Sequence, residues 1–93
     1  MTSISSYAQE RISFYEARFK TETNQQLAND FTTLSASRGW TAERSYYSHA
    51  LVCEMERRGI NLEAVIDNKG GATIIHYVPV VYDETTHAMI PLR

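Results

Sequence analysis

A chain of 93 residues with 43% hydrophobic and 22% charged side chains has the composition of one globular domain, too small for two cores. We therefore predict a single compact domain over residues 1–93. The net charge of −2 gives no overall attraction to nucleic acid or to an anionic membrane. A single cysteine, the lack of a signal-peptide pattern and the lack of a long apolar stretch predict a cytoplasmic protein without membrane contact.

Two amphipathic helices are predicted in the first half of the chain. Apolar residues recur at helical spacing over residues 4–20, and Phe14 lies beside this stripe and widens it. Thr23 followed by Gln26 has the spacing of a capping box, which predicts the start of a second helix over residues 24–37. That helix is rich in poor helix formers, so packing must stabilise it.

The third predicted helix covers residues 42–58 and has clear signals at both ends. Thr41 is an N-cap candidate, because its hydroxyl can accept a backbone N–H of the first turn. Gly59 can adopt the left-handed conformation that ends a helix, with Ile60 folding back on Met55 in the Schellman geometry. This segment separates the helical half from a strand-like remainder.

The last third has the alternation and turn residues of a β-meander. We predict strands over residues 60–66, 73–82 and 88–92. A short helical turn capped by Asn61 is the alternative for the first of them. Residues 68–71 predict a turn, and Pro79 places the middle strand at an edge because proline has no N–H to donate. The expected fold class is α+β, with three N-terminal helices packed on a small antiparallel meander of two or three strands.

No arrangement of residues in the sequence predicts catalysis. His49 and Cys53 are four apart and share a helix face, a spacing that two metal ligands could use, but no motif supplies the further ligands of a zinc site. Asp83, Glu84 and His87 fall in a predicted hairpin loop, where polar residues are expected in any case. We therefore expect no enzyme activity, no metal, no cofactor and no small-molecule substrate.

Nucleic-acid binding is the alternative function. The second and third helices, joined by a short turn, have the outline of a helix-turn-helix, and the hairpin after them could serve as the wing of a winged helix. Candidate contact residues for nucleic acid or another partner are Arg38, Arg44, Ser48, His49, Tyr46 and Lys69. The acidic Glu54 and Glu56 on the third helix argue against nucleic-acid binding. The sequence also offers only about four basic side chains for this surface, whereas proteins that bind duplex DNA firmly make roughly six to ten phosphate contacts.

The preferred prediction is a small non-catalytic binding or regulatory module that acts through protein–protein contacts, self-association included. Ten aromatic residues, six of them tyrosines, exceed what a small core readily encloses with every hydroxyl satisfied. Tyrosine, tryptophan and arginine dominate binding hot spots. The tyrosines expected to reach the surface are Tyr7, Tyr46, Tyr47 and Tyr82. An edge strand around Pro79 could pair with a second copy or with a partner strand.

Overall fold

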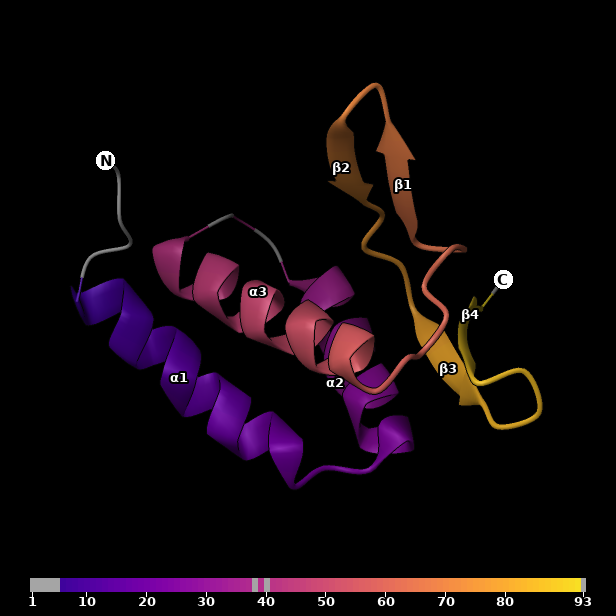
Figure 1. Cartoon of the computed structure of the whole chain (residues 1–93), viewed down its shortest axis with the longest axis horizontal. Coiled ribbons are helices and arrows are strands. Elements are labelled where there is room, and N and C mark those ends of the chain that lie inside the picture. Colours follow the sequence, from indigo (N-terminus) through magenta and orange to yellow (C-terminus); the bar gives the residue numbers. More distant parts are fainter. Residues whose placement is uncertain (1–5, 38, 40, 93) are drawn as a thin grey trace.

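The computed structural model describes residues 6–37, 39 and 41–92. Three helices come first along the chain, and two separate antiparallel hairpins follow (Figure 1). The elements are α1 (Ser6–Lys20), α2 (Asn24–Ala36), α3 (Ala42–Arg57), β1 (Ile66–Lys69), β2 (Ala72–Ile75), β3 (Val80–Asp83) and β4 (Ala88–Pro91). The predicted α+β fold, with N-terminal helices and a small C-terminal antiparallel meander, is confirmed.

The helices form one side of the molecule and the hairpins the other (Figure 1). α1 packs along α3, and α2 contacts both α3 and β3. The largest fully buried side chains come from all these layers: Phe19, Phe31, Leu27, Leu51, Met55, Met89, Val65 and Val80. The core therefore lies between the helices and the inner face of the β3–β4 hairpin, while α1 and the β1–β2 hairpin lie at its outer sides.

The helix ends follow the local signals in the sequence. The capping box is formed: the Thr23 hydroxyl accepts the Gln26 N–H at 3.1 Å, and the Gln26 side chain accepts the Thr23 N–H at 2.7 Å. Helix α3 starts after Thr41, whose hydroxyl accepts the Arg44 N–H at 3.1 Å. The predicted beginning of the first helix at residues 4–5 lies outside the described residues.

Helix α3 ends in the predicted Schellman geometry. Gly59 has φ +74°, and its N–H donates to the Glu56 carbonyl at 3.0 Å. The Ile60 N–H reaches back to the Met55 carbonyl at 3.1 Å, and both of these side chains are buried. The glycine therefore ends the helix and returns the chain to the core.

The predicted strand over residues 60–66 is wrong, and the alternative turn is closer to the structure. Asn61 forms an isolated bridge to Ala88, and its side chain then accepts the Glu63 N–H at 2.8 Å. The N–H groups of Val65 and Ile66 both donate to the Leu62 carbonyl, so this stretch is a turn, and β1 begins only at Ile66. The side chain of Asn61 competes with strand pairing by bonding the backbone locally.

The predicted strand over residues 73–82 is two strands, β2 and β3, which belong to different hairpins. Residues 76–79 between them form no regular structure. Pro79 cannot donate a ladder hydrogen bond, and the chain here passes from the β1–β2 hairpin to the β3–β4 hairpin. The apolar sequence pattern runs through both strands, although β2 is mostly exposed and β3 begins with the buried Val80.

Candidate functional site

Two aromatic side chains project from the outer side of α1. Tyr7 is 61% and Phe14 55% exposed, the highest values among the large apolar side chains that the structure describes. They are seven residues apart, so they share one side of the helix with Arg11 between them. Tyr46 of α3 packs edge to face against Tyr7, with ring centroids 6.2 Å apart. We call Tyr7, Arg11, Phe14 and Tyr46 the α1 aromatic face.

Arg11 is held in place at the centre of this face. Its Nε and Nη2 donate to one carboxylate oxygen of Glu43, at 2.9 and 2.6 Å. The Tyr15 hydroxyl donates to the same oxygen and also accepts from Arg11 Nη2. The guanidinium lies over the Phe14 ring, 4.8 Å from its centroid. The arginine therefore presents a fixed orientation beside an exposed aromatic ring.

The charges around Arg11 reinforce one another. Hydrogen bonds from Arg11, and then from Tyr15, lower the pKa of Glu43 below its usual value. The hydrogen bond that Arg11 donates to Glu43 also raises the pKa of Arg11 further above its usual value. Glu43 also lies in the first turn of α3, where the helix dipole favours a negative charge. This ion pair therefore stays charged throughout the neutral range.

A hollow of about 350 Å³ adjoins the α1 aromatic face. It lies between the side of α1, the end of α2 and the start of α3, and its lining is Tyr15, Arg18, Thr33, Leu34, Ser37, Thr41, Glu43, Arg44 and Tyr47. Glu43 and Tyr15 line this hollow and also orient Arg11. The hollow and the face are therefore one continuous surface feature.

Two mostly buried carboxyl groups lie beside Arg18 of the hollow: Glu22 in the turn between α1 and α2, and Asp30 within α2. Arg18 contacts Glu22 at 3.3 Å and Asp30 at 3.7 Å. Burial, and then hydrogen bonding with Glu22, raises the pKa of Asp30 to about 7. Burial and the nearby Asp30 charge raise the pKa of Tyr47 to about 12. At neutral pH the Asp30 carboxyl is therefore near its titration midpoint.

Two of the predicted nucleic-acid contacts, Arg44 and Ser48, are engaged in contacts within the chain. Arg44 folds back on its own turn: its guanidinium donates to the carbonyls of Gly39 and Leu34, both at 3.2 Å, and lies over the Tyr77 ring. Ser48 is only 3% exposed and hydrogen-bonds the Tyr77 hydroxyl at 2.7 Å. Ser48 is therefore a buried residue, and the half-buried Arg44 joins α3 to the end of α2 and to the turn between them.

The four remaining predicted contacts differ in how far the structure describes them. His49 is exposed, and Tyr46 belongs to the α1 aromatic face. Lys69 is the last residue of β1, in the distant hairpin, and nothing is described of its side chain. Arg38 lies outside the described residues. The prediction therefore named one residue of the α1 aromatic face, Tyr46, and one residue of the adjoining hollow, Arg44.

His49 and Cys53 meet on α3 as their spacing predicts, with Nε2 and Sγ 3.6 Å apart. Burial, followed by the charges of Glu56 and Glu16, raises the pKa of the Cys53 thiol, which opposes a reactive thiolate. Among the residues that the structure describes, no group of three or more His, Cys, Asp and Glu side chains is placed to hold a metal ion.

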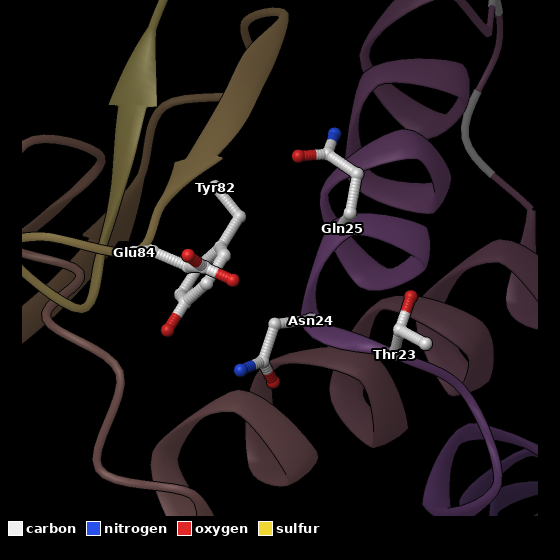
Figure 2. A pocket seen from close by; sticks show the side chains of 5 residues that line it. All are labelled: Thr23, Asn24, Gln25, Tyr82 and Glu84. Carbon is white, nitrogen blue, oxygen red and sulfur yellow. The ribbon is translucent and has the colours of Figure 1, made fainter.

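A second, polar pocket of about 440 Å³ lies between the start of α2 and the β3–β4 hairpin (Figure 2). It is lined by Thr23, Asn24, Gln25, Tyr82 and Glu84. Four of these side chains already have partners: Thr23 caps α2, Gln25 donates to Asn29 at 3.3 Å, Asn24 accepts from Arg58 at 2.8 Å, and Tyr82 bonds the His87 Nδ1 at 2.5 Å. These contacts cap α2, join its start to the end of α3 and brace the loop of the hairpin, so these polar groups have structural roles.

His87 has a positive φ of 52°, which is unusual for a residue other than glycine. Its Nε2 is 2.9 Å from the Arg58 carbonyl, so this nitrogen carries the proton and donates, and the Tyr82 hydroxyl donates to Nδ1. The imidazole thereby joins the loop of the second hairpin to the end of α3. The carboxylate of Asp83, the last residue of β3, accepts hydrogen bonds from both the N–H and the hydroxyl of Thr86.

The sequence prediction missed Arg11, Phe14 and Glu43. Phe14 was expected to widen the buried stripe of the first helix, but it is exposed on the other side. The spacing of Tyr7, Arg11 and Phe14 is the signal that could have shown a second stripe on the same helix. Nothing in the sequence indicates that Glu43, thirty-two residues after Arg11, is its partner.

No protein-family model, no curated protein and no solved structure matches the chain. No helix in the described part of the chain is long and apolar enough to cross a membrane.

Proposed function

We propose that the chain is a small, non-catalytic binding module that acts through protein–protein contacts, with the α1 aromatic face as its recognition surface. The observation that carries this proposal is the exposure of Tyr7 and Phe14, both above half, on either side of an arginine that is already held in place. The single cysteine is consistent with the cytoplasm as the proposed location.

The chemistry of the face supports a protein partner. Tyrosine and arginine are enriched among the residues that dominate binding energy, and aromatic rings offer large contact areas for few rotatable bonds. Arg11 is restrained by Glu43 and Tyr15, so little side-chain entropy remains to be lost when a partner binds. A face of this kind binds an apolar or aromatic side chain better than it binds a polyanion, because its arginine is already neutralised by Glu43.

The neighbouring hollow supports the same proposal. Apolar parts of Tyr15, Leu34 and Tyr47 line it together with polar groups of α3. Its volume of about 350 Å³ is enough for one large side chain of a partner. A partner segment that crosses α1 could place one residue there while it covers Phe14.

The nucleic-acid alternative has less support. Arg44 bonds the turn before its own helix, and Ser48 is buried against Tyr77. Neither side chain is available in this arrangement for a phosphate or a base edge, and the carboxylate of Glu54 lies further along the same helix. The alternative therefore has no specific observation in its favour.

Site-specific photocrosslinking tests the proposal. A photoreactive phenylalanine analogue at position 14 should capture a discrete protein adduct in cells that express the chain, and the same analogue at exposed position 25 should not. Tyr7→Ala in the position-14 background should abolish the adduct, while Ile90→Ala, which removes a similarly exposed side chain from the opposite hairpin, should preserve it. Equal labelling at positions 14 and 25, or an adduct indifferent to Tyr7→Ala, would refute the recognition surface.

A further inference from the structure

The β1–β2 hairpin carries a strand edge that is open to pairing. It projects away from the helices (Figure 1), and three of the four β2 residues are exposed. Ile66 pairs with Ile75 and Lys69 with Ala72 across the hairpin. Gly70 and Gly71, with φ of 58° and 83°, form the two-residue turn with two positive φ values that suits a tight hairpin.

The hydrogen-bond pattern identifies which backbone groups of β2 face outward. The His76 N–H donates to the Val65 carbonyl at 2.7 Å, so these opposed residues form a hydrogen-bonded pair. Such pairs alternate with non-bonded pairs in an antiparallel ladder. Ile74 is therefore bonded to β1, whereas the N–H and C=O groups of Thr73 and Ile75 point away from β1. No other described residue donates to or accepts from these groups.

The edges of the other hairpin are partly covered. On β3 the outward groups of Val80 are both taken by the Thr32 hydroxyl, at 2.9 and 3.0 Å. On β4 the Met89 N–H donates to the Asn61 carbonyl, and Pro91 has no N–H to offer. Natural proteins commonly protect sheet edges in these ways. On β1 the Ile66 N–H donates to the Leu62 carbonyl. Among the four described strands, β2 is therefore the one with no outward backbone group bonded elsewhere in the chain.

We infer that β2 is the pairing edge of a homodimer, in which the β2 strands of two copies run antiparallel and join the two hairpins into one four-stranded sheet. Thr73 of each copy would then oppose Ile75 of the other, and each of these pairs would exchange two hydrogen bonds. Ile74 would lie directly opposite the second copy's Ile74 at the two-fold axis. The inference does not rest on the proposed function, because α1 lies on the other side of the molecule (Figure 1).

A second copy fits this edge for two reasons. First, in the symmetric register the Ile74 side chain, which is 48% exposed, covers the Ile74 side chain of the second copy. Second, no two like charges lie opposite each other, because His76 of one copy faces Ala72 of the other and already contacts Asp67 of its own chain at 3.1 Å. The outer side of β1 is different: Glu63 and Glu56 line the hollow beside it. On that side the Ile66 N–H already donates to the Leu62 carbonyl at 2.9 Å, so β1 offers a less open edge, and the assembly closes as a two-fold dimer.

Analytical ultracentrifugation of the full chain tests the inference. The wild type should show a concentration-dependent dimer. Ile74→Lys should weaken it at least about tenfold, since two like charges would lie directly opposite. Ile90→Lys, which adds the same charge to the other hairpin, should leave the dimer unchanged. Mixing Ile74→Lys with Ile74→Glu should restore a heterodimer.

Hydrogen exchange gives a second readout that does not depend on any variant. The amides of Thr73 and Ile75 should become protected as the protein concentration rises, while the Ile74 amide, bonded to β1 within one copy, should be protected at every concentration. A wild type that stays monomeric up to about 200 μM, a dimer that Ile74→Lys does not weaken, or protection independent of concentration would each overturn the inference.

Discussion

Arg11 in α1 and Glu43 in α3 are thirty-two residues apart in the chain, and two nitrogens of the arginine bond one oxygen of the glutamate. The pair joins two helices at the surface. It also fixes the arginine beside Phe14, the exposed ring of the α1 aromatic face. One contact thus connects the packing of α1 on α3 with the surface that we propose for partner recognition.

Replacing Glu43 by Gln should release Arg11 from its fixed orientation. The exposed pair contributes little to stability, so the thermal midpoint should change only slightly, whereas partner capture through position 14 should weaken.

The small stabilisation from the Arg11–Glu43 pair should be lost in acid, because the pKa of Glu43 is lower in the folded than in the unfolded chain. The stabilisation is present above the unfolded pKa near 4.5 and disappears as the pH falls through the folded pKa. Unfolding measured by circular dichroism across the acid range should show no such loss for Glu43→Gln.

Asp30 should make the protein less stable as the pH rises toward neutrality. Its pKa is raised to about 7 in the folded state, above the usual 3.8, so the folded state holds the proton more tightly than the unfolded chain does. The advantage is complete below the unfolded value and is lost as the pH rises through about 7. We expect a decrease on the order of 2 kcal/mol in urea unfolding between pH 5 and 8.

Asp30→Asn should remove this pH dependence, because the amide resembles the protonated carboxyl at every pH. Glu22, Arg18 and Tyr47 also face this group, so the titration belongs to the cluster rather than to Asp30 alone. Glu63→Gln, at an exposed carboxyl on the opposite side, is the matched control and should keep the wild-type slope. A slope that persists in Asp30→Asn would contradict the assignment.

Glu54 should be among the most sensitive positions for stability. It is 4% exposed and accepts hydrogen bonds from Arg57 and Arg58. Arg58 also donates to the Phe19 carbonyl and to Asn24, both at 2.8 Å, and so joins the ends of all three helices. Glu54→Gln leaves this arginine without its counter-charge and should cost about 3 kcal/mol in urea unfolding. Arg57→Ala, which alters the solvent side of the same cluster, should have a much smaller effect.

Ser48 and Tyr77 should be coupled in stability. Their hydroxyls are 2.7 Å apart, and Ser48 is buried. Ser48→Ala and Tyr77→Phe should each lower the free energy of unfolding by about 1 kcal/mol, and the double variant should lose less than the sum. If Ser48 were instead a surface contact for nucleic acid, its removal would leave stability unchanged.

Random-sequence duplex DNA should not bind the chain. The phosphate contribution to binding is strongest at low salt, so fluorescence anisotropy at about 50 mM salt is the most permissive condition. Binding that weakens steeply with added salt, and that Arg44→Ala reduces, would revive the nucleic-acid alternative.

The sequence predicted the helices well because their signals act within a turn of backbone. The capping box at Thr23 and the Schellman ending at Gly59 join residues that are close in the chain, and both are formed. The strands were predicted less well. Residues 73–82 have one continuous apolar pattern but supply two hairpins, because the pattern records residue type and not which strand each residue pairs with.

The candidate site was largely out of reach of sequence reasoning. Tyr46 was named, but Arg44 and Ser48 were assigned to the surface of the third helix and are directed toward Leu34 and Tyr77. The type of a residue indicates what its side chain can bind. It does not indicate which groups of the same chain that side chain contacts in the folded protein.

The amino-acid sequence by itself determined where the helices begin and end, the α+β order of the elements and the tight turn at Gly70 and Gly71. Each depends on backbone conformations and hydrogen bonds a few residues apart. The tertiary structure alone decided that Arg11 contacts Glu43 and that Phe14 faces outward. It also decided that β2 keeps an open edge, while the Thr32 hydroxyl bonds the outward groups of Val80 on β3. Those features depend on how distant segments are placed against one another, and local signals carry no information about that placement.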